Sequence, residues 1–341
     1  MIDGKGYLQG VDPYSTLVKT QTVTKADIEP YMEDLPVAGN VLDMGELRDD
    51  LDDFFTTQTE LLGAKMPWPS THEKIRFRGG ETTLWAGVNG HGKSLMVGLM
   101  CLAFAAQNEK FLMISLEMKP RDVLGRMCKQ ATGVENPSKK ARDEFCYFLL
   151  NQGFMYAHQG TMSEKFVYAC VRYAASAGIK HVVVDNIQKC VKGVDNYNAQ
   201  KDFVNDITQL AQQLNVHCHV VHHIRKQQSE HELPNKFDLT GSGSMADLVD
   251  QIVIVYKNKK KFAMLESTKE KDVEMAKEMP DAILAVEKNR HGDWEGRIRL
   301  WFDRRNGQYR ENKRLYQIEP TKPSTYTYAL PTQTDDLEVF S

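Results

Sequence analysis

The sequence predicts an α/β fold: a mostly parallel, twisted sheet with helices on both faces and a C-terminal antiparallel hairpin. From about residue 79, short apolar segments alternate with helical segments, as is typical of a parallel sheet. Further on, Asn306-Gly307 separates two strand-like segments and indicates a hairpin turn. A glycine-rich segment, Gly87 to Ser94, lies between the first strand and the first helix. These observations define the fold class and direct attention to the end of the first strand.

The individual elements follow from apolar periodicity. The predicted strands are residues 82–86, 111–115, 154–157, 181–184, 219–222, 252–256, 283–286, 297–302 and 308–310. The predicted helices are residues 94–107, 121–130, 140–150, 163–175 and 199–214. Residues 257–279 carry many Lys and Glu residues, which predicts a surface insertion between two strands.

Three regions are expected along the chain: an N-terminal segment over residues 1–62, the main domain over 63–320 and a flexible acidic tail over 321–341. No periodic core is visible in the first 40 residues. An acidic amphipathic linker helix is then expected, because Met44, Leu47, Leu51 and Phe54 recur at helical spacing among aspartates. This helix is either a solvated surface helix or one that docks on a neighbouring subunit.

Composition excludes several classes of protein. The chain has 341 residues and a formal net charge of -3, so coating of duplex DNA by bulk charge is not expected, whereas local basic loops remain compatible with nucleic acid. No apolar stretch is long enough for a transmembrane helix, and the start lacks the regions of a signal peptide, so we expect a cytoplasmic protein without membrane contact. The six cysteines form no Cys-x-x-Cys pair, which favours reduced thiols over disulfides or zinc.

The strongest motif is Gly87-Val88-Asn89-Gly90-His91-Gly92-Lys93-Ser94, which matches the phosphate-binding loop pattern Gly-x4-Gly-Lys-Ser/Thr. Its backbone N–H groups and the following helix N-terminus favour bound phosphate, Lys93 can reach the outer phosphates, and the Ser94 hydroxyl can ligate Mg²⁺. His91 could also be a solvent-facing side chain. Phe302 could stack on a base or belong to the core. The predicted nucleotide-binding residues are Gly87, Asn89, Gly90, His91, Gly92, Lys93, Ser94, Leu95 and Phe302.

Two acidic residues end apolar strands of the same region. Asp185 follows His181-Val182-Val183-Val184 and is the predicted second metal residue beside Ser94. Glu117 follows the strand after the phosphate loop, and we expect it to orient the attacking water as the general base. The alternative for Glu117 is an acid that only favours the dipole of the next helix.

With later segments, these motifs resemble the ring-shaped replicative helicases of the DnaB-like and Twinkle-like family, including the helicase parts of phage primase-helicases. The matching segments are Ser115-Leu116-Glu117-Met118, Asp185-Asn186-Ile187-Gln188, His222-His223-Ile224-Arg225, Asp238-Leu239-Thr240-Gly241-Ser242-Gly243-Ser244 and Lys288-Asn289-Arg290-His291-Gly292. The resemblance covers about residues 75 to 310. It implies a RecA-like P-loop NTPase core, a homohexameric ring, ATP or another NTP or dNTP with Mg²⁺, and 5′ to 3′ unwinding on single-stranded DNA.

The resemblance also implies residue roles. His223 falls on the position of a γ-phosphate sensor; His222 competes for that role, and a core histidine is the alternative. Lys288 and Arg290 fall on the motif that reaches the ATP of the next subunit, where Arg290 could stabilise transition-state charge; a surface cation at a strand end is the alternative.

The DNA-binding loop motif falls on Thr240, Gly241, Ser242 and Gly243, with an ordinary flexible loop as the alternative. Many family members carry Arg where Thr240 stands, which predicts that this loop binds DNA more weakly here. Nearby cations that could compensate are Lys192, Lys201, Arg225, Lys226 and Lys236.

The tail ends in Asp335-Asp336-Leu337-Glu338-Val339-Phe340-Ser341, which resembles the acidic-aromatic tails with which replication proteins recruit primase, DNA polymerase or single-strand-binding protein; a solubilising tail is the alternative. No large N-terminal collar, zinc module or primase domain is recognised, so we expect a stand-alone phage-type helicase or the helicase part of a longer primase-helicase. A recombination or repair ATPase of the RecA or RadA type, and an ATP-switched DNA loading module, remain as alternative functions.

Overall fold

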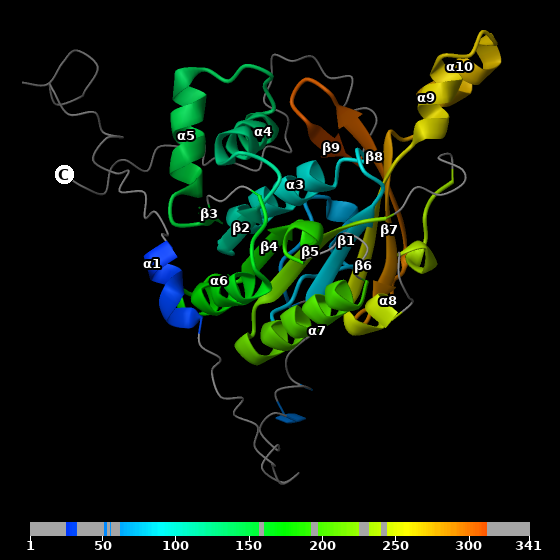
Figure 1. Ribbon diagram of the computed structural model, residues 1–341. Helices are drawn as coiled ribbons and strands as arrows, with labels where there is room; N and C mark the ends of the chain where they lie inside the picture. Colours follow the sequence, from blue (N-terminus) through cyan, green and yellow to red (C-terminus); the bar gives the residue numbers. More distant parts are fainter. Residues whose placement is uncertain are drawn as a thin grey trace, which may run out of the picture.

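The computed structural model describes residues 25–32, 51–52, 55, 62–156, 160–191, 197–224, 232–239 and 244–311. Within them the strands form one sheet in the order β3-β2-β4-β5-β1-β6-β7-β8-β9 (Figure 1). The parallel strands are β1 (Thr82–Gly87), β2 (Phe111–Ser115), β3 (Gly153–Tyr156), β4 (His181–Asp185), β5 (His217–His223) and β6 (Gln251–Lys257). The antiparallel strands are β7 (Ala282–Asn289), β8 (Gly296–Asp303) and β9 (Gln308–Arg310).

Helices cover both faces of the sheet (Figure 1). One face carries α3 (Lys93–Ala106), α4 (Pro120–Thr132) and α5 (Lys139–Leu149), and the other carries α6 (Glu164–Ser176) and α7 (Tyr197–Leu214). Strand β1 shows why both faces are apolar: Leu84 and Ala86 pack with the α6–α7 core, and Trp85 packs with the α3–α4 core. The predicted α/β class with a mostly parallel sheet is confirmed.

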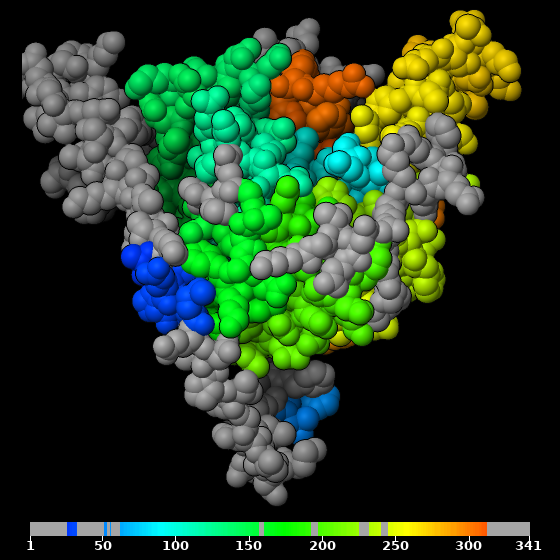
Figure 2. Space-filling model, viewed as in Figure 1, coloured from blue at the N-terminus to red at the C-terminus, as the bar shows by residue number. Residues whose placement is uncertain are grey.

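The predicted helices and strands begin within two residues of the observed ones, and the differences lie outside the repeated pattern. The insertion between β6 and β7 is a pair of helices, α9 (Lys259–Leu265) and α10 (Glu270–Glu278), which stands off the body of the molecule (Figure 2). A further short helix, α8 (Ser244–Leu248), was not predicted because five residues give too little periodicity. The sheet closes with three antiparallel strands, so the hairpin β8–β9 is only part of that region.

A short N-terminal segment packs against the core, although no periodic core was predicted there. It consists of α1 (Lys25–Ile28) and the 3-10 turn η1 (Glu29–Tyr31). Ile28 is fully buried, and the ring of Tyr31 meets that of Tyr173 on α6 edge to face at 5.7 Å. Most of the predicted acidic helix and the whole tail lie outside the described residues, as do the cations Lys192, Arg225 and Lys226.

The β8–β9 hairpin is fastened to the helices beside the phosphate loop. Gln130 on α4 donates to the carbonyls of Leu95 and Gly307 at 3.1 and 2.9 Å, and Gln308 donates to the carbonyl of Gln130 at 2.6 Å. Asn306 donates to the carbonyl of Gly133 at 2.9 Å. These bonds hold β9 against α3 and α4. No helix among the described residues has the length and apolar character needed to cross a membrane.

Candidate functional site

The phosphate loop joins the C-terminal end of β1 to α3, as its sequence predicts. Gly92 is the N-cap of α3 with φ of 88°, a left-handed conformation that favours glycine. A Cβ atom at this position would lie 2.5 Å from the hydroxyl of Tyr309 on β9. The loop is therefore confined by the hairpin, and Gly92 is required both by its backbone angle and by the space available.

Lys93 begins α3, and its side chain is buried under the loop. Its ammonium donates to the carbonyls of Gly87 and Val88 at 2.8 and 3.1 Å and lies 3.1 Å from Nδ1 of His223. Burial lowers the pKa of Lys93 to about 8, against the opposing effect of Asp185 and Glu117. The ammonium is thus held by weak neutral acceptors, which a phosphate group could replace with a stronger partner.

Asp185 ends β4 beside the start of α3, and it is buried. It lines one cavity with Ser94, whose hydroxyl favours the charged carboxylate, while Asp185 Oδ1 has no hydrogen-bond partner among the described residues. Burial raises the pKa of Asp185 to about 6, and the nearby Glu117 adds to this, whereas Ser94 and Lys93 act in the opposite direction. A buried carboxylate oxygen without a partner, next to a hydroxyl, fits a hard cation such as Mg²⁺.

Three side chains meet at the ends of β2, β4 and β5. Asn186 Nδ2 donates to Glu117 Oε1 at 2.5 Å and lies 2.7 Å from His223 Nε2, and Nε2 of His223 is 3.7 Å from Glu117 Oε1. Glu117 precedes the α4 N-cap Lys119, so it is not an acid of the first helical turn. Burial, together with the positive charge of Lys93, lowers the pKa of His223 to about 4, so its imidazole is neutral at pH 7.

The remaining predicted nucleotide-binding residues differ in their surroundings. His91 is buried, with its ring 5.6 Å from that of Tyr256, so the alternative of a solvent-facing side chain is wrong. Phe302 is partly buried and packs on Tyr309 with ring centroids 4.7 Å apart, beside the loop but also against the core. Asn89 and Gly90 are exposed at the loop tip, and Leu95 lines a cavity with Ser94 and Asp185.

His222 and His223 point to opposite faces of β5, so they cannot share one role. Lys93 and Asn186 contact His223, whereas His222 is 1% exposed, and neither of its ring nitrogens has a hydrogen-bond partner among the described residues. Only His223 therefore belongs to this cluster.

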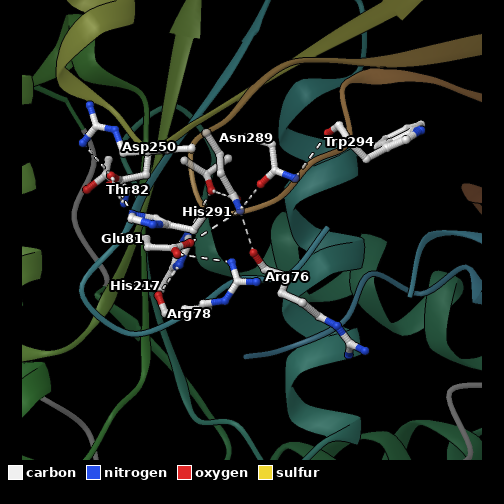
Figure 3. Close-up of polar contacts among 12 residues, drawn as sticks. Arg76, Arg78, Glu81, Thr82, His217, Asp250, Asn289, His291 and Trp294 are labelled. Carbon is white, nitrogen blue, oxygen red and sulfur yellow. Dashed lines mark hydrogen bonds and ion pairs between the residues drawn. The ribbon is translucent and has the colours of Figure 1, made fainter. Parts of the chain in front are cut away.

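Lys288 and Arg290 lie at the opposite edge of the sheet from the phosphate loop. The pairing Thr83↔Gln251↔Asn289 places the end of β7 beside the starts of β1 and β6. β1 runs from this edge to the phosphate loop over roughly 20 Å. Figure 3 shows the surrounding polar network, in which Gln251 donates to the carbonyl of Arg76 at 2.6 Å and Asn289 to that of Trp294 at 3.2 Å. Arg290 therefore cannot reach the nucleotide site of its own subunit.

The predicted DNA-binding residues are described only in part. Lys236, on the 3-10 turn η5 (Lys236–Asp238), donates to the carbonyl of Glu287 at 3.4 Å, and its neighbour Phe237 is 80% exposed. Thr240, Gly241, Ser242 and Gly243 lie outside the described residues, as do Lys192, Arg225 and Lys226. Lys201 lies on α7.

Two residues at these positions were not assigned a role from the sequence. Asn186 links Glu117 to His223, and Asp250, just before β6, holds Arg290. An asparagine after a strand end and an aspartate before one are too common to single out by pattern. Only the meeting of separate strands at one sheet edge reveals them.

Fold and site together define the class: a P-loop NTPase with a RecA-like core. Among solved structures, one described as an ATPase domain matches with a TM-score of 0.67 and 16% identity, covering 79% of this chain and 99% of that one. A DnaB-like replicative helicase, described with its interactions with primase, matches with a TM-score of 0.64 and 15% identity, covering 80% of this chain and 67% of that one. No curated protein matches this sequence.

The particular family follows from the sequence itself. The family model of the DnaB-like helicase C-terminal domain matches residues 76–311, which is more than half of the chain. The chain therefore belongs to the DnaB-like helicase family, as its motifs predicted.

Proposed function

We propose that this protein is a replicative DNA helicase that couples hydrolysis of ATP, or of another NTP or dNTP, to 5′ to 3′ movement on single-stranded DNA as a ring hexamer. The observation that carries the proposal is the separation of two half-sites within one subunit. The phosphate loop lies at one sheet edge, and Arg290 lies at the other. A complete site then needs two subunits arranged head to tail, and such contacts form a ring where the rotation from one subunit to the next closes.

In the proposed site, Lys93 and the loop backbone bind the phosphates, and Ser94 and Asp185 hold Mg²⁺. When bound, Mg²⁺ would neutralise charge that develops on the phosphates. Glu117 accepts a proton from the attacking water, with Asn186 fixing its carboxylate. His223 lies between Lys93 and Asn186 at the end of β5, so a change at the γ-phosphate can pass from it directly to the segment after Ile224.

Arg290 of one subunit would stabilise the charge that develops at the nucleotide of the next, a contribution on the order of 10³ to 10⁵ in rate where an arginine acts this way. The predicted loop over residues 240–243 would contact DNA phosphates, with Lys236 adding charge beside it. The acidic tail would recruit primase, DNA polymerase or single-strand-binding protein.

The experiment that tests this function measures nucleotide hydrolysis with and without single-stranded DNA, with mass photometry of the same samples. We expect hexamer-sized particles, hydrolysis stimulated by DNA and strand separation on a duplex with a 5′ single-stranded tail. Slow hydrolysis that DNA does not stimulate would favour a nucleotide-switched DNA loading module over a translocating motor. Strand exchange without unwinding would favour a recombinase.

A further inference from the structure

Lys288 and Arg290 donate hydrogen bonds to backbone carbonyls at the C-terminal end of a helix. The Lys288 ammonium donates to the carbonyls of Ala246 and Asp247 at 2.7 and 3.2 Å, and Arg290 Nη2 donates to the carbonyl of Asp247 at 2.8 Å. These carbonyls belong to the last turn of α8, where helix acceptors have no intrahelical partner and cations are favourable. Because α8 directly follows the predicted DNA loop, both cations are attached to the segment that leads out of that loop.

Asp250 is the buried acid at the centre of this contact, with 1% of its surface exposed. Its Oδ1 accepts from Arg290 Nη1 at 2.9 Å, and its Oδ2 accepts from the backbone N–H of Thr82 at 2.9 Å. The backbones are bonded too: Asp250 N–H donates to the Thr82 carbonyl, and Arg290 N–H donates to the Asp250 carbonyl. Figure 3 shows Asp250 beside Thr82 and His291.

This arrangement determines the direction of the guanidinium. A carboxylate whose two oxygens are both bonded, and whose backbone is paired on both sides, has little freedom to turn. Arg290 keeps 39% of its side chain exposed, so its outer edge stays available to a neighbouring molecule while its inner edge is held. Without the negative charge of Asp250, Lys288 and Arg290 would repel each other at this edge, with His291 close by.

The geometry points to Asp250 as the positioning residue for Arg290, and as the junction that joins the arginine to α8 and to the start of β1. This inference rests on the proposed function, because Arg290 has a target only in a neighbouring subunit. A displacement of Arg290 by the neighbour's nucleotide can pass along two routes. Arg290 contacts α8 directly through the Asp247 carbonyl, and α8 follows the predicted DNA loop in the sequence. Through Asp250, Arg290 is also linked to Thr82, whose strand β1 ends at the subunit's own phosphate loop.

The test compares Asp250→Asn with wild type in hydrolysis stimulated by single-stranded DNA. We expect kcat to fall about tenfold, as for the loss of a charged hydrogen bond, with KM for the nucleotide unchanged, since the binding loop is at the other sheet edge. Asp250→Asn added to Arg290→Ala should have no further effect, because Asp250 acts through Arg290. A wild-type kcat, or an equal loss in both backgrounds, would overturn the assignment.

Asp247→Asn is the matched control, because it keeps the backbone carbonyl that accepts from Arg290 and removes an exposed carboxylate that acts on Lys288 only through its charge. It should keep wild-type kcat. Hydrogen exchange without nucleotide separates this inference from the proposed function: amides of α8 should exchange faster in Asp250→Asn and Arg290→Ala, but not in Asp247→Asn. If α8 exchanges faster but hydrolysis responds neither to DNA nor to Arg290→Ala, the proposed helicase function is wrong, whereas the structural role of Asp250 is supported. Unchanged α8 exchange in Asp250→Asn overturns the junction itself.

Discussion

Asn186 donates its side-chain amide to the Glu117 carboxylate, with 2.5 Å between Nδ2 and Oε1, so an uncharged donor orients the proposed base. Replacing Asn186 by Ala should lower kcat by at least about tenfold and leave nucleotide affinity unchanged, since proton transfer depends on orientation. Steady-state kinetics with a separate binding titration checks this. Asn186→Asp places a second carboxylate beside Glu117 and should move the acidic limb of the rate profile to higher pH. An unshifted profile contradicts the contact.

Variants of Arg290 and Lys93 should complement each other in mixed rings, because each contributes the residue that the other lacks. Lys93→Ala rings and Arg290→Ala rings should each lose DNA-stimulated hydrolysis. After dissociation and mixing in equal amounts, roughly a quarter of the interfaces (half of one kind meeting half of the other) join an intact loop to an intact arginine. We expect the DNA-stimulated hydrolysis rate to return in proportion to this fraction of intact interfaces. If mixed rings form but stay inactive, Arg290 does not act across the interface.

Gly92→Ala should weaken nucleotide binding by about tenfold or more, because an alanine at φ of 88° costs roughly 1–2 kcal/mol and its Cβ meets the Tyr309 hydroxyl. Tyr309→Phe alone should bind nucleotide normally. The double variant separates the two causes: it removes the contact but keeps the backbone strain, so binding should recover only in part. Fluorescent nucleotide titration measures all three. Full recovery would mean that strain at Gly92 is negligible.

Acid should destabilise the fold through the buried histidines of β4 and β5. Burial lowers the pKa of His217 to about 3, and those of His181 and His219 well below their usual value. The unfolded chain therefore takes up protons first, and stability is full above about pH 6.5 and falls as the pH drops toward the folded value. His217 alone should contribute a loss of about 2 kcal/mol at pH 5.

Urea unfolding at pH 7.5 and pH 5 measures this loss. His217→Asn keeps a donor for the Arg78 carbonyl but cannot protonate, so its stability should change less with pH than that of wild type. Equal pH dependence in wild type and His217→Asn would exclude His217 as a source.

Lys236 should contribute one phosphate contact to single-stranded DNA. Lys236→Ala is expected to lower the slope of log K against log salt by about 0.7, with similar losses for different sequences. Fluorescence anisotropy at several salt concentrations measures the slope. Lys271→Ala, on the projecting helix α10, is the matched control and should keep the wild-type slope. Equal slopes for the two variants would show that Lys236 does not contact a DNA phosphate.

Much of this architecture could be predicted because local pattern and global fold agree in it. Alternating apolar segments indicated β1 and β2, and the spacing of Gly87 to Ser94 located the phosphate loop. The pairing of Asp185 with Ser94 follows from strand order, since parallel strands end at the same edge. The family resemblance, rather than the spacing, singled out Lys288 and Arg290.

What could not be predicted depends on contacts between distant segments. The neutral state of His223 arises from its burial beside Lys93, which no local pattern contains. The role of Asp250 requires three strands to meet at one edge. The solvent-facing alternative for His91 was wrong because loop positions are usually exposed, whereas the structure packs this side chain on Tyr256.

The position of β1 between the two half-sites has a numerical consequence for the assembly. An open arc of subunits leaves one phosphate loop and one arginine without counterparts at its ends, while a closed circle leaves none. Closing the gap therefore adds one working site without adding a subunit. The proportional gain is greatest for the smallest circle, so the turnover per subunit reports how many particles in a preparation are closed.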